Sequence, residues 1–195
     1  MIEYQYKRGD KVRKILYCTL TAITFIFTVW YMHYGVPYEN EGALSKIGLE
    51  HRIQFIVWGV LTLTTLTVGI ISAYRRYTKS RLYVPLLLAA LIGMALTLAF
   101  DFDFDKKPDY YFHCTGSLMF SVSVGVCVFL LFLFCYKQGA VFRVLTYLTA
   151  IILIADTVCL LIFKETGLIE ALPIFSGYIM LLTVNLRGDK VEVKR

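Results

Sequence analysis

Six long apolar runs, separated by short clusters of charged residues, are the feature that most constrains the fold of this chain. An α-helix of about 20 apolar residues crosses the roughly 30 Å hydrocarbon core of a bilayer. A soluble domain carries about a quarter charged residues, whereas this chain has 17% charged and 58% hydrophobic residues. The pattern therefore predicts an all-α integral membrane protein, with its 195 residues forming a single bundle of six transmembrane helices.

The predicted spans follow the apolar runs and are joined by short loops. They are Ile15–Tyr34, Ile53–Tyr74, Leu82–Phe100, Phe112–Tyr136, Leu145–Phe163 and Leu168–Leu186. Pro85 falls in the first turn of the third span, where its missing N–H does little harm. Pro108 and Asp109 are expected to precede the fourth span as its stop and N-cap. Pro173 predicts a late start or a kink in the sixth.

The charges of the loops predict how the bundle is oriented in the membrane. Fifteen of the 20 Lys and Arg residues lie before the first span, after the second, between the fourth and fifth, and after the sixth. The remaining loops hold five Lys and Arg residues against nine Asp and Glu residues. Because basic loops stay in the cytoplasm, we expect both termini there. A basic rim facing anionic lipid headgroups explains the net charge of +6 without a nucleic-acid partner.

The stretch Asp101–Gly125 joins three alternating aspartates to an apolar segment that has polar or small residues at steps of four. His113, Ser117, Ser121 and Gly125 fall on one face of a helix. This spacing predicts a histidine at the head of a small-residue seam. Small residues let membrane helices approach closely, so we expect the seam to serve helix packing more than ligand binding.

Several ionisable residues share the predicted outer boundary of the membrane. His33 ends the first span, His51 precedes the second, and Asp101 and Glu170 lie at the outer ends of the third and sixth. We therefore expect an outward-facing polar pocket. Its predicted ligand-binding residues are His113, Ser117, Asp101, His51 and Glu170. The alternative is that these are ordinary interfacial residues, since imidazole and carboxyl groups both suit the headgroup zone.

Asp156 lies inside the fifth predicted span, about seven residues, or 10 Å, from its outer end. A carboxylate in apolar surroundings is costly and usually faces a partner or a cavity. Asp156 is therefore a candidate functional residue. The alternative is a structural acid that bonds to a neighbouring helix or stays protonated.

Motifs for a metal or a cofactor do not occur in the sequence. Zinc needs three or four His, Cys or carboxylate ligands, and no His-x-x-x-His pair supplies two of them. The five cysteines lack CxxC spacing and are interpreted as small buried side chains. No nucleotide-binding or hydrolase motif is present. We therefore expect neither a bound metal nor a cofactor, although the sequence leaves open whether the three histidines and Asp101 assemble a metal site.

Three functional hypotheses follow from these residues. The first is a membrane protein whose outward-facing pocket binds a lipid or amphiphile. The second is a membrane-embedded lipid hydrolase or transferase that uses His113 with Asp101 or Asp156 as acid–base groups. The third is a small carrier centred on Asp156. The sequence leaves open whether the chain is an enzyme and whether it forms a homo-oligomer. Membrane lipids are its expected partners.

Two short stretches carry a resemblance to a known family. Ser45–Phe55, with the sequence SKIGLEHRIQF, enters the second span, and His113, Gly116 and Phe120 open the fourth. With the six short-looped spans, they resemble the DRAM/FRAG-like six-span proteins and their bacterial relatives of unassigned function. The resemblance covers nearly the whole chain. It implies a compact six-helix bundle linked to membrane-lipid handling, and it implies no catalytic residue set.

Overall fold

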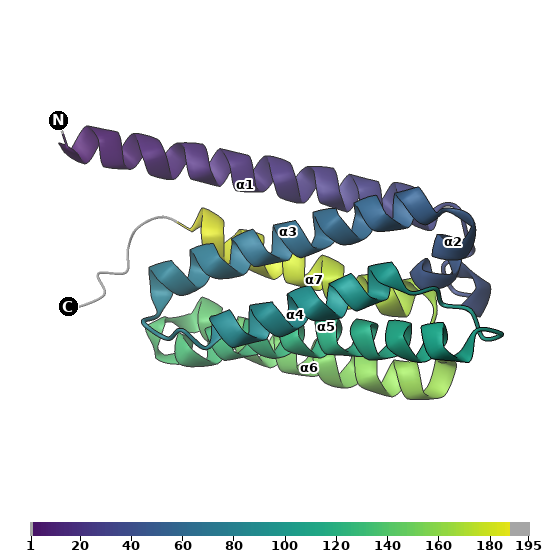
Figure 1. Ribbon diagram of the computed structural model, residues 1–195. Helices are drawn as coiled ribbons and strands as arrows, with labels where there is room; N and C mark the ends of the chain where they lie inside the picture. The colour runs from purple at the N-terminus through teal and green to yellow at the C-terminus, as the bar shows by residue number, and fades with distance from the viewer. Residues whose placement is uncertain (1, 188–195) are drawn as a thin grey trace.

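The computed structural model describes residues 2–187, with their side chains from residue 12 onward. Six long helices lie alongside one another, and the short helix α2 closes one end of the bundle (Figure 1). α1 begins and α7 ends at the opposite end. The elements are α1 (Ile2–Met32), η1 (Asn40–Gly42), α2 (Leu44–Glu50), α3 (Arg52–Tyr77), α4 (Tyr83–Ala99), α5 (Lys107–Phe134), η2 (Tyr136–Gln138), α6 (Ala140–Phe163) and α7 (Gly167–Leu186).

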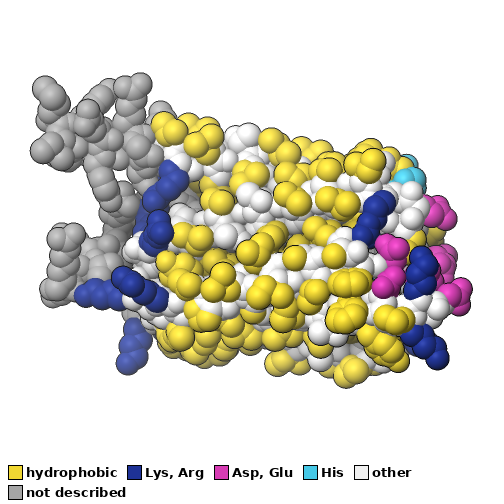
Figure 2. All heavy atoms as spheres, viewed as in Figure 1, with side chains coloured by type: hydrophobic (Ala, Val, Ile, Leu, Met, Phe, Trp, Pro, Cys, Tyr) yellow, Lys and Arg dark blue, Asp and Glu magenta, His cyan; other side chains and the backbone are white. Residues whose placement is uncertain are grey.

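Within the described residues, five helices are long and apolar enough to cross a membrane, namely α1 from Val12 onward, α3, α5, α6 and α7. α4 is apolar too, but its 17 residues reach only about 25 Å. Apolar side chains cover the visible flank of the bundle between its charged ends (Figure 2). On α6, Ile151, Ile154 and Leu161 are 63%, 66% and 80% exposed. A soluble monomer rarely exposes such a surface, so the chain is a multi-pass membrane protein.

Each predicted span coincides with one helix of the bundle, with shifts at the ends. α5 starts before its predicted span because Pro108 occupies its first turn, where no N–H is needed. The prediction that Pro108 and Asp109 precede this helix is therefore wrong. Pro85 lies in the first turn of α4, as predicted. α7 begins at Gly167 and contains Pro173, so its start is not late.

α4 and α5 approach each other so closely that their backbones touch. A Cβ atom added at Gly93 would lie 2.7 Å from the carbonyl oxygen of Gly116, and one added at Gly116 would lie 2.6 Å from the carbonyl oxygen of Gly93. Any larger residue at either position would push the helices apart. This pair of glycines brings α5 against α4 near the end of the bundle that α2 closes.

The predicted small-residue seam on α5 is packed only in part. Gly125 packs against Leu153 of α6, Ser117 is half-buried and Ser121 is exposed. The prediction that these residues share one packed face is wrong for Ser121, because the buried face of α5 follows a neighbouring stripe. That stripe includes Gly116, Phe120, Ser123 and Cys127.

Buried hydroxyl groups join α1, α3 and α7. Thr24 on α1 shares a 2.7 Å hydrogen bond with Thr65 on α3. Tyr178 on α7 donates a 2.9 Å hydrogen bond to Thr62, also on α3. The four side chains are fully buried. In an apolar bundle an unpaired hydroxyl is costly, so these bonds favour one arrangement of the three helices.

Candidate functional site

Acidic and basic side chains gather at opposite ends of the bundle. Asp, Glu and His side chains lie at the end that α2 closes, with a few Lys and Arg residues, and other Lys and Arg side chains lie at the opposite end (Figure 2). The side chains of residues 1–11, and residues 188–195, carry part of the predicted basic charge and lie outside the described residues. The acidic end contains most of the predicted site residues.

α2 is attached to the acidic end by a carboxylate from α7. Glu170 accepts hydrogen bonds from the backbone N–H of Leu44 at 2.5 Å and from the hydroxyl of Ser45 at 3.0 Å. The first N–H groups of a helix lack partners within it, and Ala43, the N-cap residue of α2, supplies no side-chain bond. Tyr31 of α1 donates to the carbonyl of Leu44 at 2.9 Å. Glu170 thus holds α2 against the bundle.

Side chains from α3 and α5 hold the C-terminal end of α4. His113 on α5 places Nδ1 3.0 Å from the carbonyl oxygen of Phe100. Arg52 on α3 donates to the carbonyl of Leu98 and forms a 3.2 Å ion pair with Asp101. The last carbonyl groups of a helix lack partners within it, and these two donors supply them. His113 and Asp101 therefore meet at one structural junction.

Protein encloses the ring of His113. The residue is 1% exposed, and its ring centroid lies 5.2 Å from that of Phe102 and 6.1 Å from that of Phe55. A carbonyl only accepts hydrogen bonds, so Nδ1 carries the proton in this bond. Nε2 is then a buried acceptor without a hydrogen-bond partner among the described residues.

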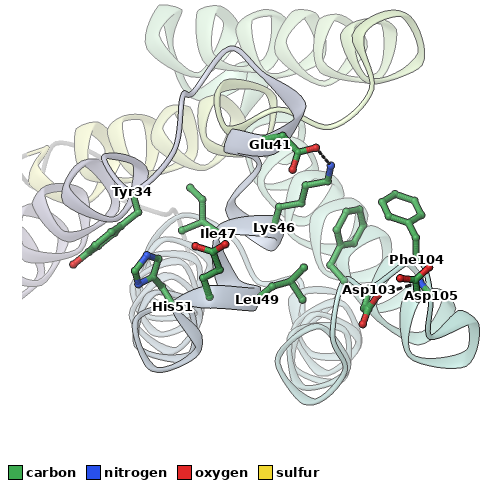
Figure 3. Close-up of a pocket in the computed structure, with 11 residues that line it drawn as sticks. Tyr34, Glu41, Lys46, Ile47, Leu49, His51, Asp103, Phe104 and Asp105 are labelled. Carbon is green, nitrogen blue, oxygen red and sulfur yellow. Dashed lines mark hydrogen bonds and ion pairs between the residues drawn. The ribbon is translucent and has the colours of Figure 1, made fainter.

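A pocket of about 380 Å³ opens at the acidic end. Figure 3 shows Tyr34 and His51 on one side, Asp103, Phe104 and Asp105 on the other, and side chains of α2 between them. The other lining residues are Glu41, Lys46, Ile47, Leu49, Glu50 and Phe102. The pocket therefore combines aromatic and aliphatic surface with charged groups at the boundary of the apolar belt.

Contacts among the lining residues fix two walls of the pocket. Lys46 Nζ lies 2.6 Å from a carboxylate oxygen of Glu41 and 5.7 Å from the ring centroid of Phe104. On the opposite side, the ring centroids of Tyr34 and His51 are 4.1 Å apart. One wall thus already holds an ammonium group between a carboxylate and an aromatic face.

The loop between α4 and α5 is stabilised by its own charges. Lys106 Nζ lies 3.8 Å from Asp101 and 3.5 Å from Asp103. A carboxylate oxygen of Asp103 accepts a 3.0 Å hydrogen bond from the backbone N–H of Asp105. These bonds involve Asp101 and Asp103 but not the carboxylate of Asp105, which has no hydrogen-bond or ion-pair partner among the described residues.

Glu165, in the turn between α6 and α7, adds another acid at this end. Its backbone carbonyl accepts a 2.7 Å hydrogen bond from the side-chain amide of Asn40. Burial raises the pKa of its carboxyl group above the ordinary value, and the positive charge of Lys46 opposes that shift. The acidic groups of this end therefore lie in the α6–α7 turn as well as in the pocket.

The five predicted ligand-binding residues lie in different parts of the structure and make different contacts. His51 lines the pocket. Asp101 and His113 lie at the end of α4, and Glu170 holds α2. Ser117 is half-buried one turn further along α5. The expectation that all five form one ligand-binding group therefore remains a prediction, and the pocket itself involves mainly other residues.

Sequence reasoning missed Arg52 and the aromatic wall of the pocket. Phe102 and Phe104 alternate with the aspartates of the Asp-Phe-Asp-Phe-Asp run, and both line the pocket together with Tyr34. Part of the signal was present, since Tyr is enriched at the membrane boundary and Tyr34 lies at the end of the first apolar run.

Asp156 lies apart from the residues of the acidic end. It is half-buried on α6, does not line the pocket, and has no hydrogen-bond or ion-pair partner among residues 2–187. The structural alternative of a bond to a neighbouring helix is therefore not realised in this structure.

No protein-family model, curated protein or solved structure matches the chain. The resemblance to the DRAM/FRAG-like proteins stays a prediction. The residues that carry it on α5, His113, Gly116 and Phe120, are all buried. Two of them have structural contacts with α4, since His113 bonds to Phe100 and Gly116 touches Gly93.

Proposed function

We propose that this chain is a six-span membrane protein that binds a lipid or another amphiphile in the pocket at its acidic end. The supporting observation is the lining of that pocket, which combines Tyr34, Phe102 and Phe104 with carboxylates and a lysine. Ligand sites typically pair apolar walls with a few polar groups in volumes of roughly 300–1,000 Å³. At a membrane boundary, an amphiphile can place its apolar part against the aromatic residues and its polar part against the charged ones.

We further infer that α4 is the sixth span and that the acidic end faces outward. α3 ends at the basic end and α5 begins at the acidic end, so the chain has to cross the apolar belt between them. α4 supplies that crossing, and the excess of basic residues at the other end supports cytoplasmic termini. An impermeant thiol reagent should label a cysteine introduced at Lys107, and not one at Lys79, on intact cells. The reverse pattern would overturn this orientation.

Filling the pocket tests the proposed binding. Leu49 lines the pocket and is 45% exposed, so Leu49→Trp adds bulk without disturbing the buried core. We expect at least a fivefold loss of co-purified lipid, measured by native mass spectrometry. Ile53→Trp, at a position 76% exposed and outside the pocket, is the matched control and should retain its lipid. Equal lipid occupancy in the two variants would rule out the pocket as the binding site.

The enzyme and carrier hypotheses have less support from the geometry. His113 is enclosed and bonded to a backbone carbonyl, so it does not line the pocket where a lipid substrate would lie. Asp156 lies on α6 away from that pocket. Neither residue is therefore positioned to act on a molecule bound at the acidic end in this conformation.

A further inference from the structure

We propose that the ligand of the acidic-end pocket carries a positively charged amine, either ammonium or quaternary ammonium. This inference rests on the proposed function and specifies its ligand. The pocket is lined by four carboxylates, those of Glu41, Glu50, Asp103 and Asp105, against one lysine. This excess of negative charge would repel an anionic headgroup, whereas it attracts a cationic one.

The pairing of the charges shows which carboxylates remain available. Lys46 is already paired with Glu41, and Asp103 with Lys106 outside the pocket. The carboxylates of Glu50 and Asp105 have no ion-pair or hydrogen-bond partner among the described residues. Two unpaired acids therefore remain in the lining, and it contains no unpaired lysine or arginine to balance them.

Aromatic rings provide the second half of amine recognition. The ammonium of Lys46 lies 5.7 Å from the ring centroid of Phe104 while it contacts Glu41. This lysine occupies the environment that an amine ligand would need, a carboxylate beside an aromatic face. Tyr34 and Phe102 add two more rings to the lining, and their apolar surface suits the methyl or methylene groups next to the nitrogen.

A divalent metal ion fits this pocket less well than an amine. Within the described part of the chain, no group of three or more His, Cys, Asp or Glu residues is arranged to hold a metal ion. Glu50 is the last residue of α2 and Asp105 lies in the α4–α5 loop, so the two acids come from different segments of the chain. A cation that gains from aromatic faces as well as scattered carboxylates matches the lining better.

The test uses the full chain in detergent, offered equal amounts of phosphatidylethanolamine, phosphatidylcholine and phosphatidylglycerol. We expect native mass spectrometry to show the two amine lipids bound at least fivefold over phosphatidylglycerol. The double variant Glu50→Gln/Asp105→Asn should abolish this preference, so that the three lipids bind to roughly equal extents. The control Glu39→Gln/Asp109→Asn removes two acids outside the pocket and should keep it. The cationic group could belong to a lipid headgroup or to a free ammonium compound, and tetramethylammonium as a competitor separates the two. If this ion displaces the bound lipid, the pocket recognises a free ammonium ion as well as a lipid headgroup.

The outcomes separate this inference from the proposed function. Lipid binding that Leu49→Trp abolishes, but that shows no preference for amine headgroups, would overturn the amine assignment and leave the pocket as a lipid site. A preference that the control loses as strongly as Glu50→Gln/Asp105→Asn would also overturn it. Binding that Leu49→Trp leaves unchanged would overturn the proposed function and the amine assignment together.

Discussion

The α4–α5 pair and the α1–α3–α7 group are held together by different kinds of contact. Between α4 and α5, the backbones touch at Gly93 and Gly116, where an added Cβ would lie 2.6–2.7 Å from backbone oxygen. Between α1 and α3, side chains separate the helices, and the hydroxyls of Thr24 and Thr65 meet at 2.7 Å. The first contact depends on shape, and the second depends on hydrogen bonds.

This difference indicates which contacts contribute most to the stability of the bundle. Lipid tails are as apolar as the helices, so no hydrophobic force drives membrane helices together. Association depends on van der Waals packing and hydrogen bonds, and single interhelical hydrogen bonds average only about 0.6 kcal/mol. We therefore expect substitutions at the α4–α5 contact to be more destabilising than those among the hydroxyls of α1, α3 and α7.

The largest effect is expected for Gly116→Ala. Its Cβ would lie 2.6 Å from the carbonyl oxygen of Gly93 and 2.7 Å from the backbone nitrogen of Thr97, and a helix backbone cannot yield locally. We expect the unfolding free energy to fall by about 2 kcal/mol, measured by unfolding in mixed detergent and dodecyl sulfate.

Gly125→Ala is the matched control on the same helix. The new Cβ would meet only the end of the Leu153 side chain, at 2.7 Å, and that side chain can rotate. Its unfolding free energy should stay within about 0.5 kcal/mol of the parent. Equal stabilities of Gly116→Ala and Gly125→Ala would contradict the backbone contact between α4 and α5.

An intermediate effect is expected for His113→Leu. The substitution keeps an apolar side chain of similar size but removes the hydrogen bond to Phe100, so the unfolding free energy should fall by about 1 kcal/mol. Lipid occupancy should stay unchanged, because His113 does not line the pocket. His33→Leu, at an exposed position near the same end, should change neither quantity. If His113→Leu lost its lipid but kept the stability of the parent, His113 would be a ligand-binding residue and not a structural one.

The smallest effect is expected for Thr65→Val. The shapes are nearly identical, and Thr24 keeps its 2.9 Å bond to the carbonyl of Leu20, so the loss should be about 0.5 kcal/mol. Thr64→Val is the control on the neighbouring residue, whose hydroxyl bonds only within α3, and its stability should match the parent. A loss for Thr65→Val larger than that for Gly116→Ala would reverse the comparison between the two regions.

The helices were predictable because their signal is local. A run of apolar residues long enough to cross a bilayer forms a helix whatever its neighbours, since a backbone in hydrocarbon has to satisfy its own hydrogen bonds. The ends were less predictable. A proline marks a helix boundary whether it lies just before the helix or in its first turn. Only the fold shows that Pro108 lies inside the first turn of α5. The short helix α2 was missed because its 7 residues depend on the cap that Glu170 provides.

The grouping of the site residues could not be predicted in the same way. Composition alone placed His51, Asp101, His113 and Glu170 at one boundary, and the structure keeps all four at the acidic end. Their roles differ because each depends on which helix end lies next to it. An unpaired N–H or carbonyl group at a helix terminus attracts whichever carboxylate, imidazole or guanidinium group the packing brings near.

The sequence by itself determined the membrane class, the approximate positions of the six long helices and the separation of acidic from basic loops, because each follows from the composition of short consecutive segments. Only the tertiary structure decided that Gly116 rather than Ser121 faces a neighbouring helix. It also decided that Tyr34, His51 and Phe104 line one pocket. These residues come from segments far apart in the chain, and their distances depend on how α2 and the α4–α5 loop fold over the end of the bundle.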